Sequence, residues 1–201
     1  MKSRIIHRFI LIISTIICAM ACSANSITHA DSIEISLLTC SPHDEVYSLY
    51  GHTAIRCHDL RTGEDLVVNY GMFSFDQPYF IARFVFGVTD YMMGITSFDI
   101  FCSQYRNENR GVTEQVLNLS EGDKIAIVTA IGENARPENV TYRYNYFYNN
   151  CTTRARDIII DNIVDGKVEW RGPTDSSATF RSLIHEWNKD HRWARLGNDL
   201  L

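Results

Sequence analysis

The most reactive side chain in the sequence is the thiol of Cys151, which lies between a segment of alternating aromatic residues and an aliphatic, helix-like segment. We expect Cys151 near the start of a helix, where free N–H groups and the helix dipole favour thiolate over thiol. The same N–H groups can stabilise the oxyanion of a tetrahedral intermediate. The alternative is that Cys151 is a small core residue, which is the usual role of a free cysteine.

A thiol nucleophile needs a base, and histidine is the residue type that serves near neutral pH. Five of the seven histidines lie in or near the N-terminal export segment, in a turn or in the C-terminal tail: His7, His29, His43, His185 and His191. His52 begins a predicted strand directly after Gly51, where a close backbone approach is easy, and His58 lies further along the same strand. We predict that His52 is the base, with His58 or a purely structural histidine as the alternatives.

A third polar group would orient the imidazole, and the strand that returns toward His52 offers Asn69 and Tyr70. These two side chains point to opposite faces, and the sequence does not fix the register of the hairpin. Asn69 is the stronger prediction, because it follows the apolar Val67 and Val68, and a polar amide in an apolar setting indicates a specific role. Tyr70 is a candidate substrate-binding residue.

Arg154 and Tyr148 flank the nucleophile and are two further candidates for substrate binding. Arg154 lies in the first turn of the expected helix, where the dipole disfavours a cation by roughly a few tenths of a kcal/mol. We interpret it as a ligand for a lipid phosphate or a carboxylate, or as the partner of Asp157 or of another carboxylate at the edge of the core in an ion pair. Tyr144, Tyr146 and Tyr148 alternate before the cysteine and either line an apolar pocket that excludes water or form one face of an ordinary core strand.

The elements that position these residues follow from the hydrophobic pattern. Strands are predicted over residues 33–38, 52–58, 65–73, 90–96 and 112–119, and helices over residues 78–86, 99–107, 120–133, 153–163 and 179–187. Residues 141–148 alternate like a further strand, and a turn at residues 61–64 joins two strands into a hairpin. The predicted class is α+β: a small antiparallel sheet with helices packed around it.

The N-terminus has the pattern of an export signal, with basic residues followed by an apolar run at residues 9–21 that is short for a membrane span. Cleavage after Ala30, lipid attachment at Cys22 and an uncleaved anchor are the alternatives. We therefore expect residues 1–30 to be a signal peptide or lipoprotein signal, and residues 31–201 to form one domain in the periplasm.

Composition excludes several other classes of function. The chain of 201 residues carries a formal net charge of −5 without a basic block, so nucleic-acid binding is not expected. The four cysteines beyond the signal are Cys40, Cys57, Cys102 and Cys151, and their disulfide pairing is not decidable. Cys40 enters a Pro turn without a helix dipole, so it is not the predicted nucleophile. No CxxC or HxxxH spacing occurs, so we expect no metal and no cofactor.

Six segments carry a resemblance to a known family: residues 37–42, 50–56, 69–71, 108–110, 144–147 and 149–157. Together they resemble the Lnb N-terminal periplasmic domain family of Bacteroidota-type bacteria. The resemblance implies a permuted papain-like (NlpC-type) arrangement, in which the strand with His52 precedes the helix with Cys151.

The same resemblance implies lipoprotein N-acylation at the membrane surface. An acyl chain from a phospholipid would pass to the thiol of Cys151 as a thioester, and then to the free α-amine of a lipoprotein acceptor. Two alternatives stay open: a Cys-His amidase or thioesterase of the same fold, in which water attacks the acyl-enzyme, and a non-catalytic envelope binding module.

Overall fold

The computed structural model describes residues 29–45, 47–73, 78–169 and 177–199. The predictions on signal cleavage and on lipidation at Cys22 therefore lie outside the described residues, apart from the last two residues of the segment 1–30. The strands are β1 (Ile33–Cys40), β2 (His52–Asp59), β3 (Glu64–Met72), β4 (Asp90–Ser97), β5 (Val112–Val116) and β6 (Thr141–Arg143). The helices are the 3-10 turn η1 (Ala30–Ser32), α2 (Phe80–Val85), α3 (Phe98–Asn107), α4 (Glu121–Asn134), α5 (Cys151–Ile160), α6 (Phe180–Trp187) and α7 (Arg192–Asn198).

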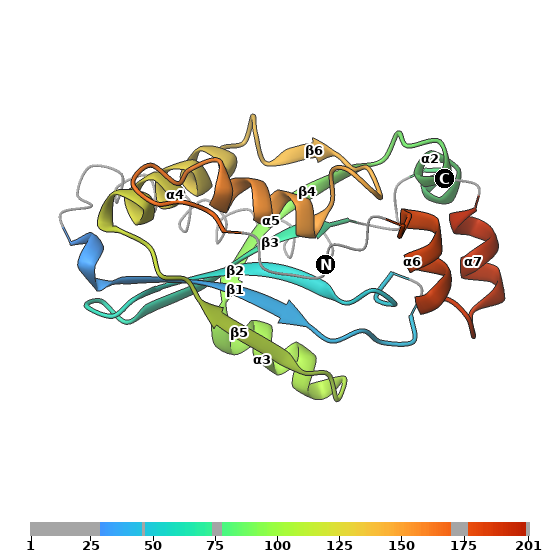
Figure 1. Cartoon of the computed structure of the whole chain (residues 1–201), viewed down its shortest axis with the longest axis horizontal. Helices are drawn as coiled ribbons and strands as arrows, with labels where there is room; N and C mark the ends of the chain where they lie inside the picture. The colour runs from blue at the N-terminus through green and yellow to red at the C-terminus, as the bar shows by residue number, and fades with distance from the viewer. Residues whose placement is uncertain (1–28, 46, 74–77, 170–176, 200–201) are drawn as a thin grey trace, which may run out of the picture.

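The six strands form one sheet in the order β5-β1-β2-β3-β4-β6, and every neighbouring pair is antiparallel (Figure 1). The hairpin of β2 and β3 lies at its centre. The α+β class is thus confirmed. Within the described residues, no helix has the length and apolar character needed to cross a bilayer.

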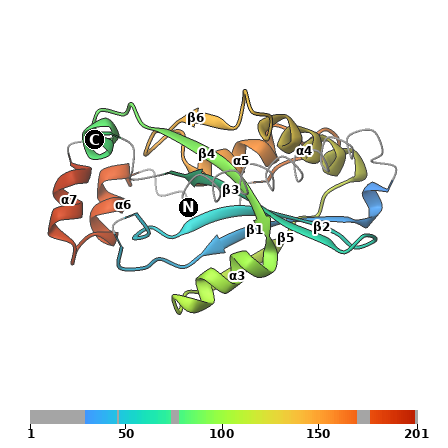
Figure 2. The ribbon, with the colours of Figure 1, turned by 180° about the vertical axis from the view of Figure 1, so that it is seen from behind.

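Helices lie on both faces of the sheet: α4 and α5 cover one face and α3 covers the other (Figure 1 and Figure 2). Because side chains alternate along a strand, Ile55 packs in the core under α4 and α5, while the neighbouring Ala54 packs beside α3. Helices α4 and α5 contribute the fully buried Ile127 and Ala155, and α3 contributes Phe101. The larger core therefore holds α5 against the sheet.

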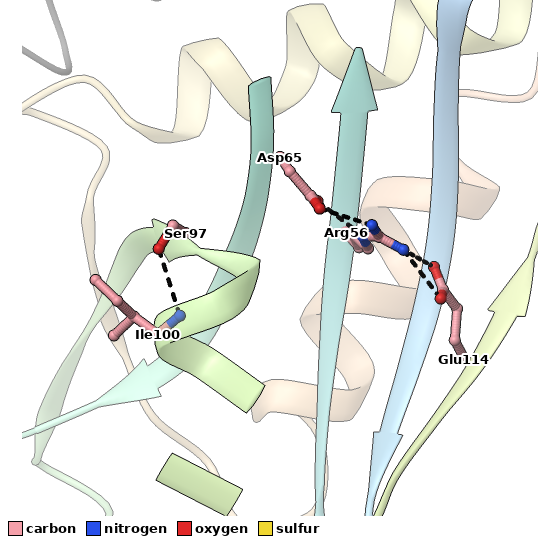
Figure 3. A network of polar contacts seen from close by, with 5 residues as sticks. All are labelled: Arg56, Asp65, Ser97, Ile100 and Glu114. Atoms are coloured by element: carbon pink, nitrogen blue, oxygen red, sulfur yellow. Dashed lines mark hydrogen bonds and ion pairs between the residues drawn. The ribbon is translucent and has the colours of Figure 1, made fainter. Parts of the chain in front are cut away.

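The face of the sheet near α3 carries a charged clamp across three strands (Figure 3). The guanidinium of Arg56 on β2 donates to Asp65 on β3 at 2.7 and 2.6 Å, and to Glu114 on β5 at 2.8 and 3.0 Å. It also lies 3.8 Å from the centre of the Phe98 ring. Beside it, Ser97 caps α3 by accepting a hydrogen bond from the amide of Ile100.

Local polar groups explain where the elements differ from the predicted ranges. Helix α5 begins at Cys151, two residues earlier than the pattern predicts, because the Asn150 side chain caps it. The predicted strand over residues 141–148 ends at Arg143, because the side chain of Asn145 accepts hydrogen bonds from two amides that follow and turns the chain. Helix α7 was not predicted, and α2 is shorter than the expected residues 78–86.

Candidate active site

The thiol of Cys151 lies on the first residue of α5. The Asn150 side-chain oxygen accepts hydrogen bonds from the amides of Thr152 and Thr153, each at 3.0 Å, and the Thr153 hydroxyl accepts one from the Asn150 amide. This reciprocal capping box fixes the first turn but takes no bond from the Cys151 amide. The Cys151 amide and the positive end of the helix therefore remain directed toward the thiol and any group bound to it.

Beside α5, the ends of β2 and β3 that carry His52 and Asn69 are no longer paired with each other. Their pairing runs from Asp59–Glu64 to Ile55–Val68, and a register shift interrupts the pairing of β3 with β4 between Asn69 and Met72. Such bulges commonly re-aim the chain next to functional sites.

Two glycines let the backbone approach closely at this opening. Gly51 has a φ of 72°, and a side chain there would collide with the carbonyl oxygen of Cys40. Gly71 has a φ of 95°, and the position of its absent Cβ lies 3.6 Å from the Cβ of Cys151 and 4.0 Å from Cε1 of His52. Gly71 thus lets the end of β3 lie against Cys151, and Gly51 lets the start of β2 lie against the end of β1.

His52 contacts both Asn69 and Cys151. Its Nε2 lies 2.5 Å from Oδ1 of Asn69, which is an acceptor, so Nε2 carries the proton in the neutral ring. The nitrogen left to accept a proton is then Nδ1. The His52 ring and Cys151 approach the same point beside Gly71, and they lie close enough for each to shift the pKa of the other. The structure therefore brings together the three side chains that the sequence singles out as nucleophile, base and orienting group.

The two reactive groups shift each other's pKa in opposite directions. Burial alone would raise the pKa of Cys151, but the hydrogen bond and charge of His52, with the amide of Thr53 and the hydroxyl of Thr152, lower it below the ordinary value. Burial alone would lower the pKa of His52, but Cys151 and Asn69 raise it above the ordinary 6.5. This arrangement favours a thiolate–imidazolium pair.

The other three cysteines of the described residues have raised pKa values, in contrast to Cys151. Burial raises the pKa of Cys40 to about 11 and that of Cys57 to about 12, and it also raises the pKa of Cys102. All four cysteines are free. Of the cysteines that the structure describes, Cys151 alone has a lowered pKa, which agrees with its place at a helix start.

A tyrosine that sequence reasoning did not single out also lies at the site. Tyr142 is buried, and its hydroxyl donates to no acceptor among the described residues. Burial and then the charge of Cys151 raise its pKa, while Arg154 and the Gly71 amide oppose this rise. Tyr142 continues the alternation of Tyr144, Tyr146 and Tyr148 at every second position, so the sequence pattern could have indicated it.

The predicted substrate-binding residues have three different environments. The Arg154 guanidinium donates to Oδ1 of Asn149 at 2.6 Å and lies 4.2 Å from the centre of the Tyr142 ring. The alternative ion pair of Arg154 with Asp157 is wrong, because Arg156 holds that carboxylate at 2.6 Å.

Tyr70 and Tyr148 lie at opposite extremes of burial. Tyr70 is 1% exposed, its hydroxyl has no partner among the described residues, and its ring meets Tyr142 edge-on. Tyr148 is 70% exposed and packs against Phe180 of α6. Only Tyr148 is accessible to a ligand that arrives from solvent. Among the residues that the structure describes, no group of three His, Cys, Asp or Glu side chains could hold a metal ion.

The comparison with protein families identifies the chain. Residues 22–186 match the family described as the Lnb N-terminal periplasmic domain, and the chain belongs to this family. The resemblance predicted from the six sequence segments is thus confirmed, and the protein is an envelope protein with a periplasmic domain. No curated protein and no solved structure matched the chain.

Proposed function

We propose that this chain is a Cys-His acyltransferase of the cell envelope that N-acylates lipoproteins, with a phospholipid as acyl donor at the membrane surface. The observation that supports this most directly is the pairing of Cys151, at the start of α5, with His52 and Asn69. A lowered thiol pKa beside an oriented imidazole is what a thiol nucleophile requires.

The first half of the reaction forms the acyl-enzyme. His52 accepts the proton of Cys151, and the thiolate attacks the carbonyl carbon of the donor ester. The tetrahedral intermediate collapses, the bond to the glycerol oxygen breaks, and His52 returns its proton to that oxygen. The products are a lysophospholipid and a thioester on Cys151.

The second half transfers the acyl group. The neutral α-amine of the lipoprotein attacks the thioester carbon, and His52 takes a proton from the attacking nitrogen. Collapse expels the Cys151 thiolate, which regains the proton from His52, and leaves an amide on the acceptor. No cofactor takes part in either half.

We propose two donors to stabilise the oxyanion in both halves. One is the amide of Cys151 at the helix start, and the other is the buried hydroxyl of Tyr142, whose proton stays free to donate because the Gly71 amide can only donate to it. Oxyanion donors of this kind are each worth about 10²–10³ in rate. We propose that Arg154 positions the Tyr142 ring through its cation–π contact.

A hydrolase is the second candidate, and the partial exposure of Cys151 and the exposure of Thr152 favour it, because water can then reach the thioester. The contact between His52 and Cys151 makes a non-catalytic binding module the weaker alternative.

Intact-mass spectrometry separates these functions. Incubation with phospholipid and no acceptor should give an adduct of fatty-acyl mass on the wild type, which hydroxylamine removes and which Cys151→Ala lacks. Tyr142→Phe should slow its formation by about 10²-fold. Steady release of fatty acid or peptide without an adduct would identify a hydrolase. An unmodified thiol with no turnover of any donor would contradict both enzyme functions.

A further inference from the structure

A pocket lies next to the candidate active site, between the end of α2 and the segment that leads into α5. It has a volume of about 240 Å³ and is lined by residues 84–87, Thr89 and residues 144–147. Most of these side chains are aromatic or aliphatic. The nucleophile lies only a few residues beyond the second lining segment.

Tyr144 links this pocket to Cys151. It lines the pocket and stacks on Tyr91, with ring centres 4.0 Å apart. Burial raises the pKa of both phenols, and the charge of Cys151 raises it further, so both rings lie within electrostatic reach of the thiolate. A group bound in the pocket therefore contacts a tyrosine whose pKa responds to the charge of Cys151.

The rim of the pocket exposes large apolar side chains. Val85 and Phe86, which line it at the end of α2, are 36% and 79% exposed. Arg83 is the only charged residue in the stretch 79–88, and its guanidinium donates to the carbonyl of Val88 at 3.3 and 3.1 Å and pairs with Asp90. Clustered exposed apolar side chains mark a binding site rather than ordinary surface.

Four of the nine lining residues have polar side chains: Thr89, Tyr144, Asn145 and Tyr146. The side chain of Asn145 accepts from two amides of its own turn. The Thr89 hydroxyl is buried and has no partner among the described residues. A peptide or sugar would require several free polar partners, whereas a hydrocarbon chain requires none.

We infer that this pocket binds the hydrocarbon chain of the acyl donor. This inference rests on the proposed acyl transfer at Cys151. Pockets for whole drug-sized ligands measure about 300–1,000 Å³, so this one takes part of a chain. The remainder crosses the apolar rim at Phe86.

Chain-length selectivity tests the inference. The acylation rate of Cys151 is measured with p-nitrophenyl octanoate and p-nitrophenyl acetate, both as monomers. Each methylene buried in the pocket should favour the longer ester by about fourfold, so a ratio of about tenfold or more is expected. The double variant Val85→Ser/Phe86→Ser should lose this preference. Ile81→Ser, an equally exposed change on the same helix outside the lining, should keep it.

A binding measurement separates the pocket from the chemistry. The Cys151→Ala protein should bind the fluorescent fatty acid cis-parinaric acid, and Val85→Ser/Phe86→Ser in that background should weaken binding by about tenfold or more. Equal weakening by Ile81→Ser, or no binding at all, would overturn the pocket even if both esters acylate Cys151. If cis-parinaric acid binds and the Val85→Ser/Phe86→Ser change weakens its binding, but neither ester acylates Cys151, the pocket stands and the proposed acyl transfer is wrong.

Discussion

The thiol of Cys151 and the imidazole of His52 each hold the other in its charged form. The thiolate charge is stabilised by the imidazolium, by the amide of Thr53 and by the hydroxyl of Thr152. The imidazolium is stabilised in turn by the thiolate and by Asn69. The stabilisation of the two charges by these groups exceeds the effect of burial, which disfavours the charged form of both side chains.

The pH dependence of alkylation should show this pairing. Because the pKa of Cys151 is lowered, iodoacetamide should react with it well below the ordinary thiol pKa of 9.0, and the pair should persist until the pH falls below the pKa of Cys151. In His52→Ala, burial dominates and raises the thiol pKa, so the rate at pH 7 should fall about tenfold or more. The rate is measured by mass spectrometry of the peptide that contains Cys151.

The matched control for this experiment is His58→Ala, which removes a histidine from the same strand at a position paired with Glu34 and Asp65. It should leave the alkylation profile of Cys151 unchanged. An unshifted profile in His52→Ala would show that His52 does not activate the thiol.

Sequence reasoning identified the site residues whose chemistry depends on their type. Cys151, His52 and Asn69 were chosen as a candidate nucleophile, base and orienting amide, and in the structure they lie close together. It missed Tyr142 and the amide of Thr53, because their electrostatic effects depend on which groups the fold brings near the sulfur. That information lies in tertiary packing and not in residue type.

At the scale of elements, the site depends on how the central hairpin ends. The turn signal at residues 61–64 and the alternation on either side were enough to predict the hairpin of β2 and β3. They were not enough to predict the register shift after Asn69, because a bulge adds a residue without a clear signal in the pattern. Gly71, with its positive φ, is the one local indication of this feature.

The same hairpin is tied to β5 through Arg56, and this clamp should stabilise the sheet. Arg56→Met should lower the free energy of unfolding by about 1–2 kcal/mol. The expected loss is below that of a fully buried pair, because Asp65 and Glu114 are 26% and 29% exposed and can be hydrated when unpaired. Urea unfolding followed by circular dichroism gives the value.

Arg61→Met is the control for the clamp, since Arg61 pairs with Asp59 at 3.7 Å and is 57% exposed. An exposed pair of this kind contributes about 0–1 kcal/mol. If both variants lose the same stability, the contacts of Arg56 to Asp65 and Glu114 do not hold the strands together.

At the scale of the whole molecule, we expect the sheet with α3, α4 and α5 to unfold as one cooperative unit, because their side chains share the two cores. The α+β class followed from the order of strand-like and helix-like patterns, but the coverage of both faces by helices did not. A helix pattern does not reveal which face of a sheet it covers. Helix α7 escaped prediction because its seven residues show little periodicity and bury none of their side chains.

Helices α6 and α7 should therefore contribute little to the stability of the sheet. Neither helix has a buried residue, and they pack mainly on each other. Their described links to the rest include ring contacts of Phe180 with Phe147 and Tyr148 and a hydrogen bond from Asn198 to Tyr50. Helices this short are marginal without burial.

A chain that ends at residue 176 tests this prediction. It should unfold in urea in one cooperative transition, with a free energy of unfolding within about 1 kcal/mol of the full chain, since exposed ring contacts and a single hydrogen bond contribute about that much. Its Cys151 should keep the alkylation rate of the full chain at pH 7, because no residue of α6 or α7 is among the groups that shift the thiol pKa. A lost or broadened transition would mean that α6 and α7 belong to the same cooperative unit as the sheet. A folded chain with a slower thiol would instead mean that these helices position the segment before α5, through the contacts of Phe180.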